Sequence, residues 1–285
     1  MAADASQTRL PRPLLVIGVP VAGAVLIAFF IYLGFPYGKL GNRIADEIQR
    51  GGGVRVEFQD IGASLHLAGP GIEATGVRAT LSDGRSYRIE RAMLRPAWSL
   101  AWFRGTPAVY AEVDSELGNA AGTLLLGAEG GWSGELSQVA IGRIPFPPLE
   151  EFGSVDGRLD ATVDIVLTEA GPAGSIVFEA TEGSVGLANF PIGIPFDTFS
   201  GELIFGDEAF VAVERLDLTG PMLTASVTGS VLRAASLSAA PMRLEAQLTT
   251  EAGLRPAIRS AGVRVDREGN SKVRISGTVA NPIVR

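Results

Sequence analysis

The stretch LTASVTGSVLR, residues 223–233, alternates apolar and polar side chains. Its odd-numbered positions up to Val231 are apolar or glycine, and its even-numbered positions from Thr224 to Ser230 are Thr or Ser. Successive side chains of an extended chain point to opposite faces, so the pattern predicts a β-strand with one apolar and one polar face. The apolar face must be covered, and what covers it decides which folds are open to the chain.

The same period of two returns through most of the chain after residue 53. Alternating runs occupy 54–59, 158–167, 242–249 and 272–279. Turn signals such as SDGR at 82–85 and REGN at 267–270 separate the runs, at the spacing of antiparallel meanders. The alternation slips near Val213 and Glu214, where we expect a β-bulge. The sequence therefore predicts a mainly β domain with a long antiparallel sheet.

Helices that could cover such a sheet are scarce. One short helix is predicted at PAWSLAWFRG, 96–105, because Pro96 suits a helix start and Gly105 a helix end. It is too short to roof a large sheet, so the apolar face must meet another sheet, the same sheet folded over, or lipid. We expect an antiparallel sheet folded on itself, like a taco or a sandwich, with this short capping helix.

The N-terminal region carries a long apolar run. Residues 14–33, LLVIGVPVAGAVLIAFFIYL, contain no charged residue, and about 20 apolar residues in a helix span the ~30 Å hydrocarbon core. The alternative is a cleaved signal peptide, whose apolar region is usually shorter and ends at a small-residue site. We expect a single transmembrane helix, an anchor over 14–35 after a tail of residues 1–13. Flanking charges do not decide its orientation; the simpler arrangement leaves the large domain outside the cytoplasm.

Residues 36–50 are predicted to form a juxtamembrane helix. Leu40, Ile44 and Ile48 recur every four residues on one helical face, and glycines 51–53 follow. This apolar stripe would either cap the next domain or rest on the membrane. The β domain is expected to occupy 51–285.

Composition excludes several classes of function. The net charge is −7 without a basic cluster, which argues against a nucleic-acid partner. There is no cysteine and only one histidine, His66, so the common zinc sites cannot be built. His66 is assigned a structural role, and Asp160 and Asp164 a solvated strand face. The chain lacks nucleophile-elbow and phosphate-loop motifs. We therefore expect no catalytic residue, no metal, no cofactor and no enzymatic activity.

Two sets of residues are candidates for binding. The proline-containing segments 141–153 and 189–199 are predicted to be loops or edges, because proline removes ladder donors. Their apolar side chains either fill the core or form a partner surface, and they are Phe146, Leu149, Ile194 and Phe196. If the apolar face forms a lipid groove, its expected lining residues are Leu223, Val227, Val231, Leu244, Leu248, Val273 and Ile275.

The order of these segments resembles a known family. One N-terminal span is followed by YGKLGNRIADEI, by RPAWSLAWFRGTPAVYAEV, by IPFPPLEEFGSVDGRLDATVDI and by a terminal SGTVANPIVR. This layout resembles the N component of type II secretion systems (GspN), in the variant with one membrane anchor. More loosely, it resembles AsmA-like β proteins, which share the strand pattern and the closing Asn-Pro.

The resemblance implies a protein of the bacterial inner membrane with most of the chain in the periplasm. It implies an accessory or assembly role in a type II secretion system, with other subunits of that system and the membrane as partners. The AsmA-like relation implies an alternative, a lipid-binding or lipid-transfer module with phospholipid in an apolar groove. Neither relation names catalytic residues.

Overall fold

The structure is a computed structural model. It describes residues 12–52, 54–66, 69–98, 105–127, 130–144, 153–187, 193–207, 209–236, 238–260 and 263–284. The side chains of residues 12–20, 22, 51–52, 153, 187, 257, 260 and 284 fall outside this description.

Two helices precede the sheet. Helix α1 covers Arg12–Leu33 and α2 covers Tyr37–Gly52, with the chain bent between them. The helix expected at 36–50 is thus confirmed, although it continues through two of the three glycines. In the described part of the chain, no single helix is long and apolar enough to cross a membrane. Gly23–Leu33 and Tyr37–Arg50 meet that requirement only as a pair, bent by 60°.

The rest of the chain is dominated by strands, as the alternation predicts. They are β1 (Arg55–Glu57), β2 (Asp60–His66), β3 (Gly69–Thr80), β4 (Ser86–Pro96), β5 (Ala108–Ser115), β6 (Gly118–Leu125), β7 (Gly131–Ala140), β8 (Gly153–Thr168), β9 (Gly171–Leu187), β10 (Ile194–Phe205), β11 (Val211–Thr219), β12 (Leu223–Val231), β13 (Pro241–Thr250), β14 (Asn270–Thr278) and β15 (Pro282–Val284). A short 3-10 turn, η2 (Ile141–Arg143), follows β7, and a short helix, α4 (Arg255–Ser260), follows β13.

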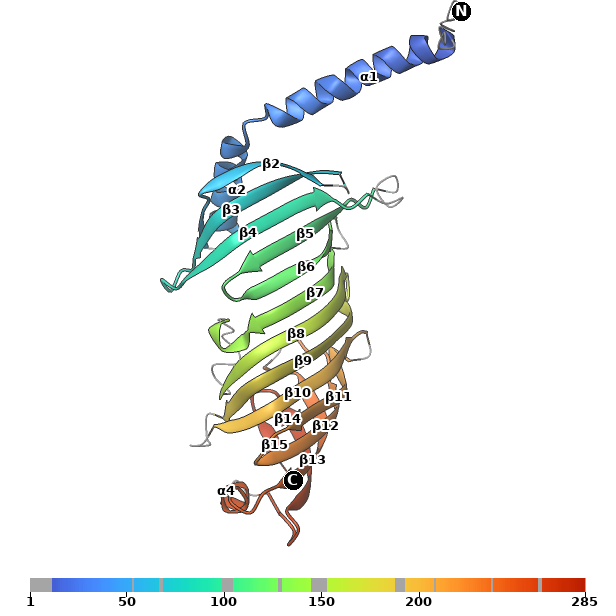
Figure 1. The fold of residues 1–285 in the computed structure, drawn as a ribbon. Coiled ribbons are helices and arrows are strands. Elements are labelled where there is room, and N and C mark those ends of the chain that lie inside the picture. Colours follow the sequence, from blue (N-terminus) through green and yellow to red (C-terminus); the bar gives the residue numbers. More distant parts are fainter. Residues whose placement is uncertain are drawn as a thin grey trace, which may run out of the picture.

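All of these strands form one antiparallel sheet of 15 strands. From β3 to β15 each strand pairs with the next in sequence, and β3 also pairs with β1 and β2. Figure 1 shows the strands stacked in sequence order, from α2 at one end to α4 at the other. The prediction of a mainly β, antiparallel chain is confirmed, and its described strands form a single sheet.

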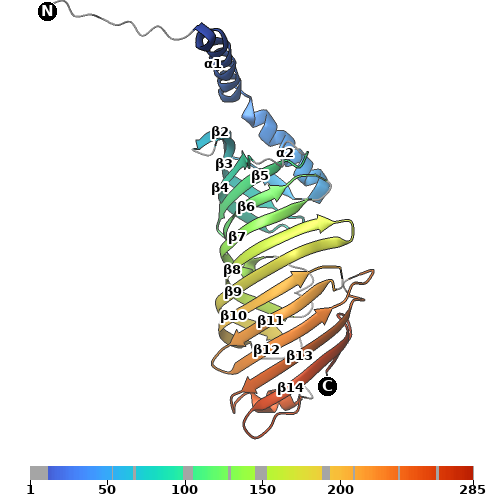
Figure 2. The ribbon, with the colours of Figure 1, turned by 90° about the vertical axis from the view of Figure 1, so that its right-hand side faces the viewer.

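The sheet bends strongly in its C-terminal half. Figure 1 shows β14 and β15 behind β10 and β11, and Figure 2, turned by 90°, shows the same bend from the side. The bulge expected near Glu214 is present: the pairing of β11 shifts between Val213 and Leu216, so that Glu214 is the extra residue. Bulges increase local twist and bending, which suits a strand in this half.

Residues 254–260 and 263–265, between β13 and β14 and here termed the plug, cover the apolar face in the bent half. Leu254 and Ile258 are almost fully buried, and they pack in one cluster with Ala180 of β9, Leu218 of β11 and Leu223 of β12. Val263 and Val265 pack against the same cluster. Helix α4 was not predicted from the sequence. Only a short sequence pattern indicates this helix: Pro256 lies in its first turn, between Leu254 and Ile258, which are four residues apart.

The helix predicted at 96–105 is wrong at its start. Strand β4 extends to Pro96, and the Ala97 amide donates to the Ala108 carbonyl at 2.9 Å, continuing the β4–β5 ladder. Pro96 can end the strand because proline costs a ladder only its own missing donor. Residues 99–104 of that prediction lie outside the described residues.

Candidate functional site

One face of the sheet is apolar along nearly its whole length. Directly opposed residues on neighbouring strands share a face, so the strand register traces rows across the sheet. One such row, here termed row 1, runs from β2 to β14 without a polar residue. Its members are Ile61, Ala74, Ala92, Val113, Ala120, Leu136, Ala161, Phe178, Gly201, Leu216, Val227, Ala246 and Val273.

A second apolar row lies beside the first on the same face. Row 2 contains Ala63, Ile72, Leu94, Ala111, Gly122, Gly134, Val163, Ile176, Leu203, Val213, Gly229, Leu244 and Ile275. Together, rows 1 and 2 define what we call the apolar face. It crosses thirteen consecutive strands of the sheet, from β2 to β14.

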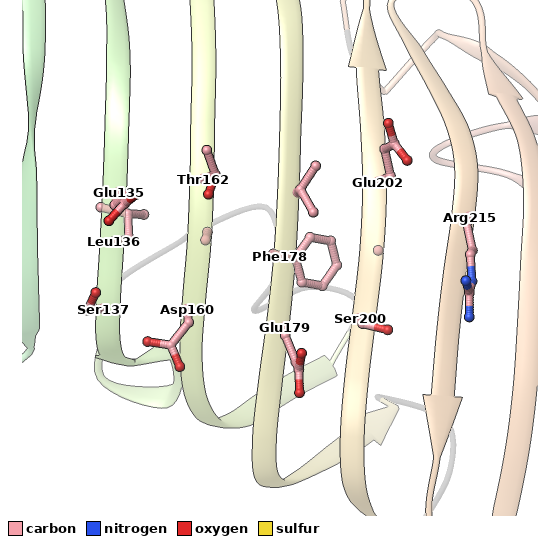
Figure 3. Close-up of a pocket in the computed structure, with 13 residues that line it drawn as sticks. Glu135, Leu136, Ser137, Asp160, Thr162, Phe178, Glu179, Ser200, Glu202 and Arg215 are labelled. Atoms are coloured by element: carbon pink, nitrogen blue, oxygen red, sulfur yellow. The ribbon is translucent and has the colours of Figure 1, made fainter.

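The opposite face is mainly polar. Between rows 1 and 2, facing the other way, stand residues such as Glu73, Glu112, Glu135, Thr162 and Glu202. Figure 3 shows Glu135, Asp160, Glu179 and Glu202 on four neighbouring strands, with Arg215 on the next, along a shallow depression of about 460 Å³. Within the part of the chain that the structure describes, no group of three or more His, Asp or Glu residues could hold a metal ion.

The apolar face is covered to different degrees along the sheet. In the bent half, the plug and the neighbouring strands bury it, as Ala180 and Leu218 show. In the N-terminal half, large apolar side chains stay exposed: Leu65 by 58%, Leu94 by 44% and Trp98 by 63%. Leu167, near the end of β8, is exposed by 53%. These exposed side chains define an open half of the apolar face between β2 and β8, although Ala74 is buried there and Ile61 packs against Gly41 of α2.

Small residues form the floor of this open half. Gly122 and Gly134 oppose each other on β6 and β7, and a Cβ atom on Gly122 would lie 2.6 Å from the Gly134 Cα. The indole of Trp132 lies over Gly122, 2.8 Å from the position of that Cβ. A side chain at position 122 would collide with this indole and with the backbone of β7, so the glycine makes room for Trp132 on the apolar face.

The seven expected groove residues share one face. Val227 and Val273 belong to row 1, Leu244 and Ile275 to row 2, and Val231 opposes Met242 on the same side. Leu223 and Leu248 lie on this face too, but they pack in or against the cluster beneath the plug. Protein therefore covers these two residues. The role of the set as a lipid lining stays a prediction.

The expected partner loops are corrected for two residues. Ile194 and Phe196 lie in strand β10, exposed by 6% and 2%, and both belong to the buried cluster. The loop assignment was wrong because Pro195 is the second residue of its strand, opposite Ser184 at the end of the β9 pairing, where the missing donor is tolerated. Burial makes these side chains core and excludes them as a partner surface. Phe146 and Leu149 lie outside the described residues.

A polar cluster that includes a serine surrounds His66. The Ser64 hydroxyl donates to Glu73 Oε2 at 2.9 Å and lies 2.8 Å from His66 Nε2. Arg91 Nε donates to Glu73 Oε1 at 2.8 Å. The hydrogen bonds from Arg91 and Ser64 hold the pKa of Glu73 below its ordinary value.

The order of this cluster differs from that of a hydrolytic triad. In a triad the histidine stands between the hydroxyl and the carboxylate, and it accepts the hydroxyl proton. Here the hydroxyl of Ser64 stands between His66 and Glu73 and gives its proton to the carboxylate. His66 then acts as a donor to Ser64, and the three side chains form a hydrogen-bonded network on the polar face.

The end of α1 is fastened to the first strands. The Tyr32 hydroxyl accepts from the Ser64 amide at 3.0 Å and from the Gly71 amide at 3.1 Å, and it lies within hydrogen-bond reach of both carbonyls. Ser64 and Gly71 oppose each other on β2 and β3. The hydroxyl of Tyr37 donates to the Tyr32 carbonyl at 2.7 Å. The helix end and the sheet edge are therefore linked at one point.

Comparison with known proteins adds no relative. No protein-family model matches the chain, and neither a curated protein nor a solved structure matches it.

Proposed function

We propose that this protein is a membrane-anchored lipid-binding protein, whose apolar face holds acyl chains. One observation carries the proposal: rows 1 and 2 stay apolar over thirteen strands, while the half from β2 to β8 is left open. Large exposed apolar surfaces usually mark a binding site. In this proposal the bent sheet forms a taco-like trough, closed by the plug at the C-terminal end.

The dimensions of the open half suit an acyl chain. From β2 to β8 it measures roughly 29 Å, at ~4.8 Å per strand. One acyl chain of a bilayer is about 15 Å long, half of the ~30 Å hydrocarbon core. The open half therefore offers room for a complete chain, which binds without any charged contact. This agrees with the mainly polar character of the other face, which water can cover.

The anchor of the proposed protein is the apolar run 14–33. The described side chains of α1 include several large apolar groups that are more than half exposed, namely Val21, Val25, Leu26, Ile27, Phe30 and Ile31. A hydrocarbon environment would cover them at no polar cost, because a helix satisfies its own backbone groups. We place this anchor in a bacterial inner membrane and the sheet in the periplasm, as the resemblance to secretion and AsmA-like proteins implies.

Photocrosslinking in living cells tests the lipid proposal. A photoreactive amino acid replaces Val163, which lies in row 2 in the open half, in the full chain. The matched control carries the same group at Thr162, the preceding residue, whose side chain points to the polar face. After irradiation, intact-mass measurement is expected to show a phospholipid adduct at position 163 and none at 162. An unmodified chain at both positions would refute lipid binding.

A role in protein secretion is a second candidate, favoured by an open strand edge. Among the residues that the structure describes, β15 covers only Ile275, Ser276 and Gly277 of β14. The remaining edge of β14 presents backbone groups to which a strand of a partner protein can add. An assembly protein of a type II secretion system would use such an edge to hold a neighbouring subunit.

The same crosslinking method distinguishes a role in protein secretion from lipid binding. A photoreactive group at Lys272, on the open part of β14, is expected to capture a protein if the edge pairs with a partner. The control position is Ser226 of β12, an inner strand, where the side chain is exposed on the polar face but both edges are paired. A protein adduct at Val163 instead would mean that a polypeptide covers the apolar face.

A further inference from the structure

Exposed apolar side chains gather at one corner of the sheet, next to the end of α1. They are Leu65 of β2, Leu94 of β4 and Trp98, which directly follows β4, and together they are termed the anchor-side corner. Leu94 belongs to row 2, and Leu65 is in step with Ala63 of the same row. The indole of Trp98 lies against Gly69 at the start of β3, 3.1 Å from the position that a Cβ would take. The corner is thus the beginning of the apolar face.

The link made by Tyr32 places this corner beside the anchor. The Tyr32 hydroxyl binds the backbone of Ser64 and Gly71, and Leu65 is the next residue along β2. Tyr32 is the penultimate residue of α1, whose last turns expose Phe30 and Ile31. Gly34, Phe35 and Pro36 continue this apolar surface across the bend to α2, around a hollow of about 500 Å³. Apolar surface is therefore continuous from α1 to the start of α2, and the Tyr32 hydroxyl joins this end of α1 to β2 and β3.

We propose that the anchor-side corner lies in the surface of the bilayer that α1 enters, and that it is the mouth through which acyl chains pass to the apolar face. This inference rests on the proposed function, since it needs α1 as an anchor. The occupant of the corner is the lipid bilayer. A membrane around α1 must lie next to Leu65, because Tyr32 belongs to the helix and binds the strand at the neighbouring residue. Tryptophan is enriched at the membrane–water interface, because its apolar ring can contact lipid while its N–H group stays near polar groups.

A polarity-sensitive fluorophore on single cysteines tests the position of the corner. The chain contains no cysteine, so each variant of the full chain carries one label. The test variant is Leu65→Cys and the matched control is Val177→Cys, a similarly apolar and exposed site on the polar face of β9. Both are reconstituted into phosphatidylcholine vesicles that contain a lipid with a nitroxide on its acyl chain. We expect the label at 65 to be quenched several-fold more strongly than the label at 177. Equal quenching at both sites, or none at 65, would overturn the proposal.

The function of the corner as a mouth has its own readout. Leu65→Asp and Trp98→Asp are expected to lower the phospholipid adduct at Val163 several-fold, because each charge resists entering the bilayer surface. Val177→Asp adds the same charge on the polar face of β9, where Val177 is exposed by 49%, and should leave the adduct within about twofold. If all three variants keep the full adduct, lipid reaches the apolar face by another route and the mouth is refuted, although lipid binding stands. If the parent protein shows no adduct, lipid binding fails, and the quenching at 65 still decides where the corner lies.

Discussion

The ring of Phe178 on β9 lies over Gly201, the residue directly opposite on β10. A Cβ atom on Gly201 would lie 2.8 Å from Phe178 Cε1 and equally close to Leu216 Cδ1. The missing side chain therefore lets a phenylalanine and a leucine from the two neighbouring strands meet over the backbone of row 1. This contact keeps the apolar face continuous where the sheet begins to bend.

Gly201→Val should destabilise the fold. The added methyl groups overlap the ring of Phe178, and overpacking of this kind costs about 1–3 kcal/mol. Urea denaturation followed by circular dichroism measures the change. Gly206→Ala is the matched control, since no atom lies within 4 Å of a Cβ at that position. An unchanged midpoint for Gly201→Val would show that Phe178 does not occupy the space above the glycine.

Leu254→Ala should be among the most damaging truncations in the plug. Leu254 is exposed by only 1%, and removal of a fully buried leucine side chain typically costs about 2–5 kcal/mol. The expected loss appears as a lower denaturation midpoint. Leu167→Ala removes the same atoms from an exposed site and should change the free energy of unfolding by less than about 0.5 kcal/mol. Similar losses in both variants would contradict the burial described for the plug.

Tyr32→Phe should loosen the connection between α1 and the sheet. The change removes one hydroxyl that serves two backbone amides, at a cost of roughly 0.5–1.5 kcal/mol for a typical hydrogen bond. Hydrogen exchange at the Ser64 and Gly71 amides is expected to accelerate. Tyr87→Phe serves as control, because its hydroxyl donates to the Arg143 carbonyl in another region. Unchanged exchange at both amides would mean that the hydroxyl does not hold this point.

The polar cluster predicts a pH dependence of stability. The pKa of Glu73 is lowered in the folded chain, chiefly by the hydrogen bond from Arg91. The charged carboxylate thus contributes stability above the ordinary glutamate pKa of about 4.3, and this contribution is lost as the pH falls through the lowered folded pKa. Glu73→Gln should therefore be less stable than the parent at neutral pH, by under about 1 kcal/mol because the pair is partly exposed.

The difference between Glu73→Gln and the parent should shrink to zero in acid. Denaturation midpoints at a series of pH values measure it. Arg91→Gln removes the main partner of the carboxylate and should reproduce the same trend. A difference that stays constant from neutral pH into acid would show that the charge of Glu73 has no part in it.

The strands could be predicted from the sequence, and the covering elements could not. The alternation from Leu223 to Val231 predicts the strand directly, because the opposite orientation of successive side chains depends only on local strand geometry. The bulge at Glu214 was readable for the same reason. Strand β10 escaped prediction because Pro195 was taken as a strand breaker, while it stands near the start of its strand. The plug escaped because a helix of six residues leaves almost no periodic signal.

The candidate site was predicted in part. That Val227, Leu244 and Val273 share a face follows from the period of two once the register is known. The open half of the face, around Leu94, could not be located, because alternation is the same for a covered and an uncovered strand. The contact between Ser64 and His66 also passed unnoticed, since the glutamate that completes it comes from the next strand.

Because the strands follow one another in sequence order, the length of the sheet depends directly on the number of strands. From β4 to β15 each strand pairs only with its neighbours in sequence, so no long crossover fixes their number. Insertion or deletion of one complete hairpin would change the distance between the α1 end and the plug by about 10 Å, at ~4.8 Å per strand. The structures at the α1 end and at the plug would not change, and the residues of rows 1 and 2 would remain on one face of the sheet. Duplication or loss of a short gene segment that encodes one hairpin can therefore change the length of the sheet, while the α1 end and the plug keep their structures.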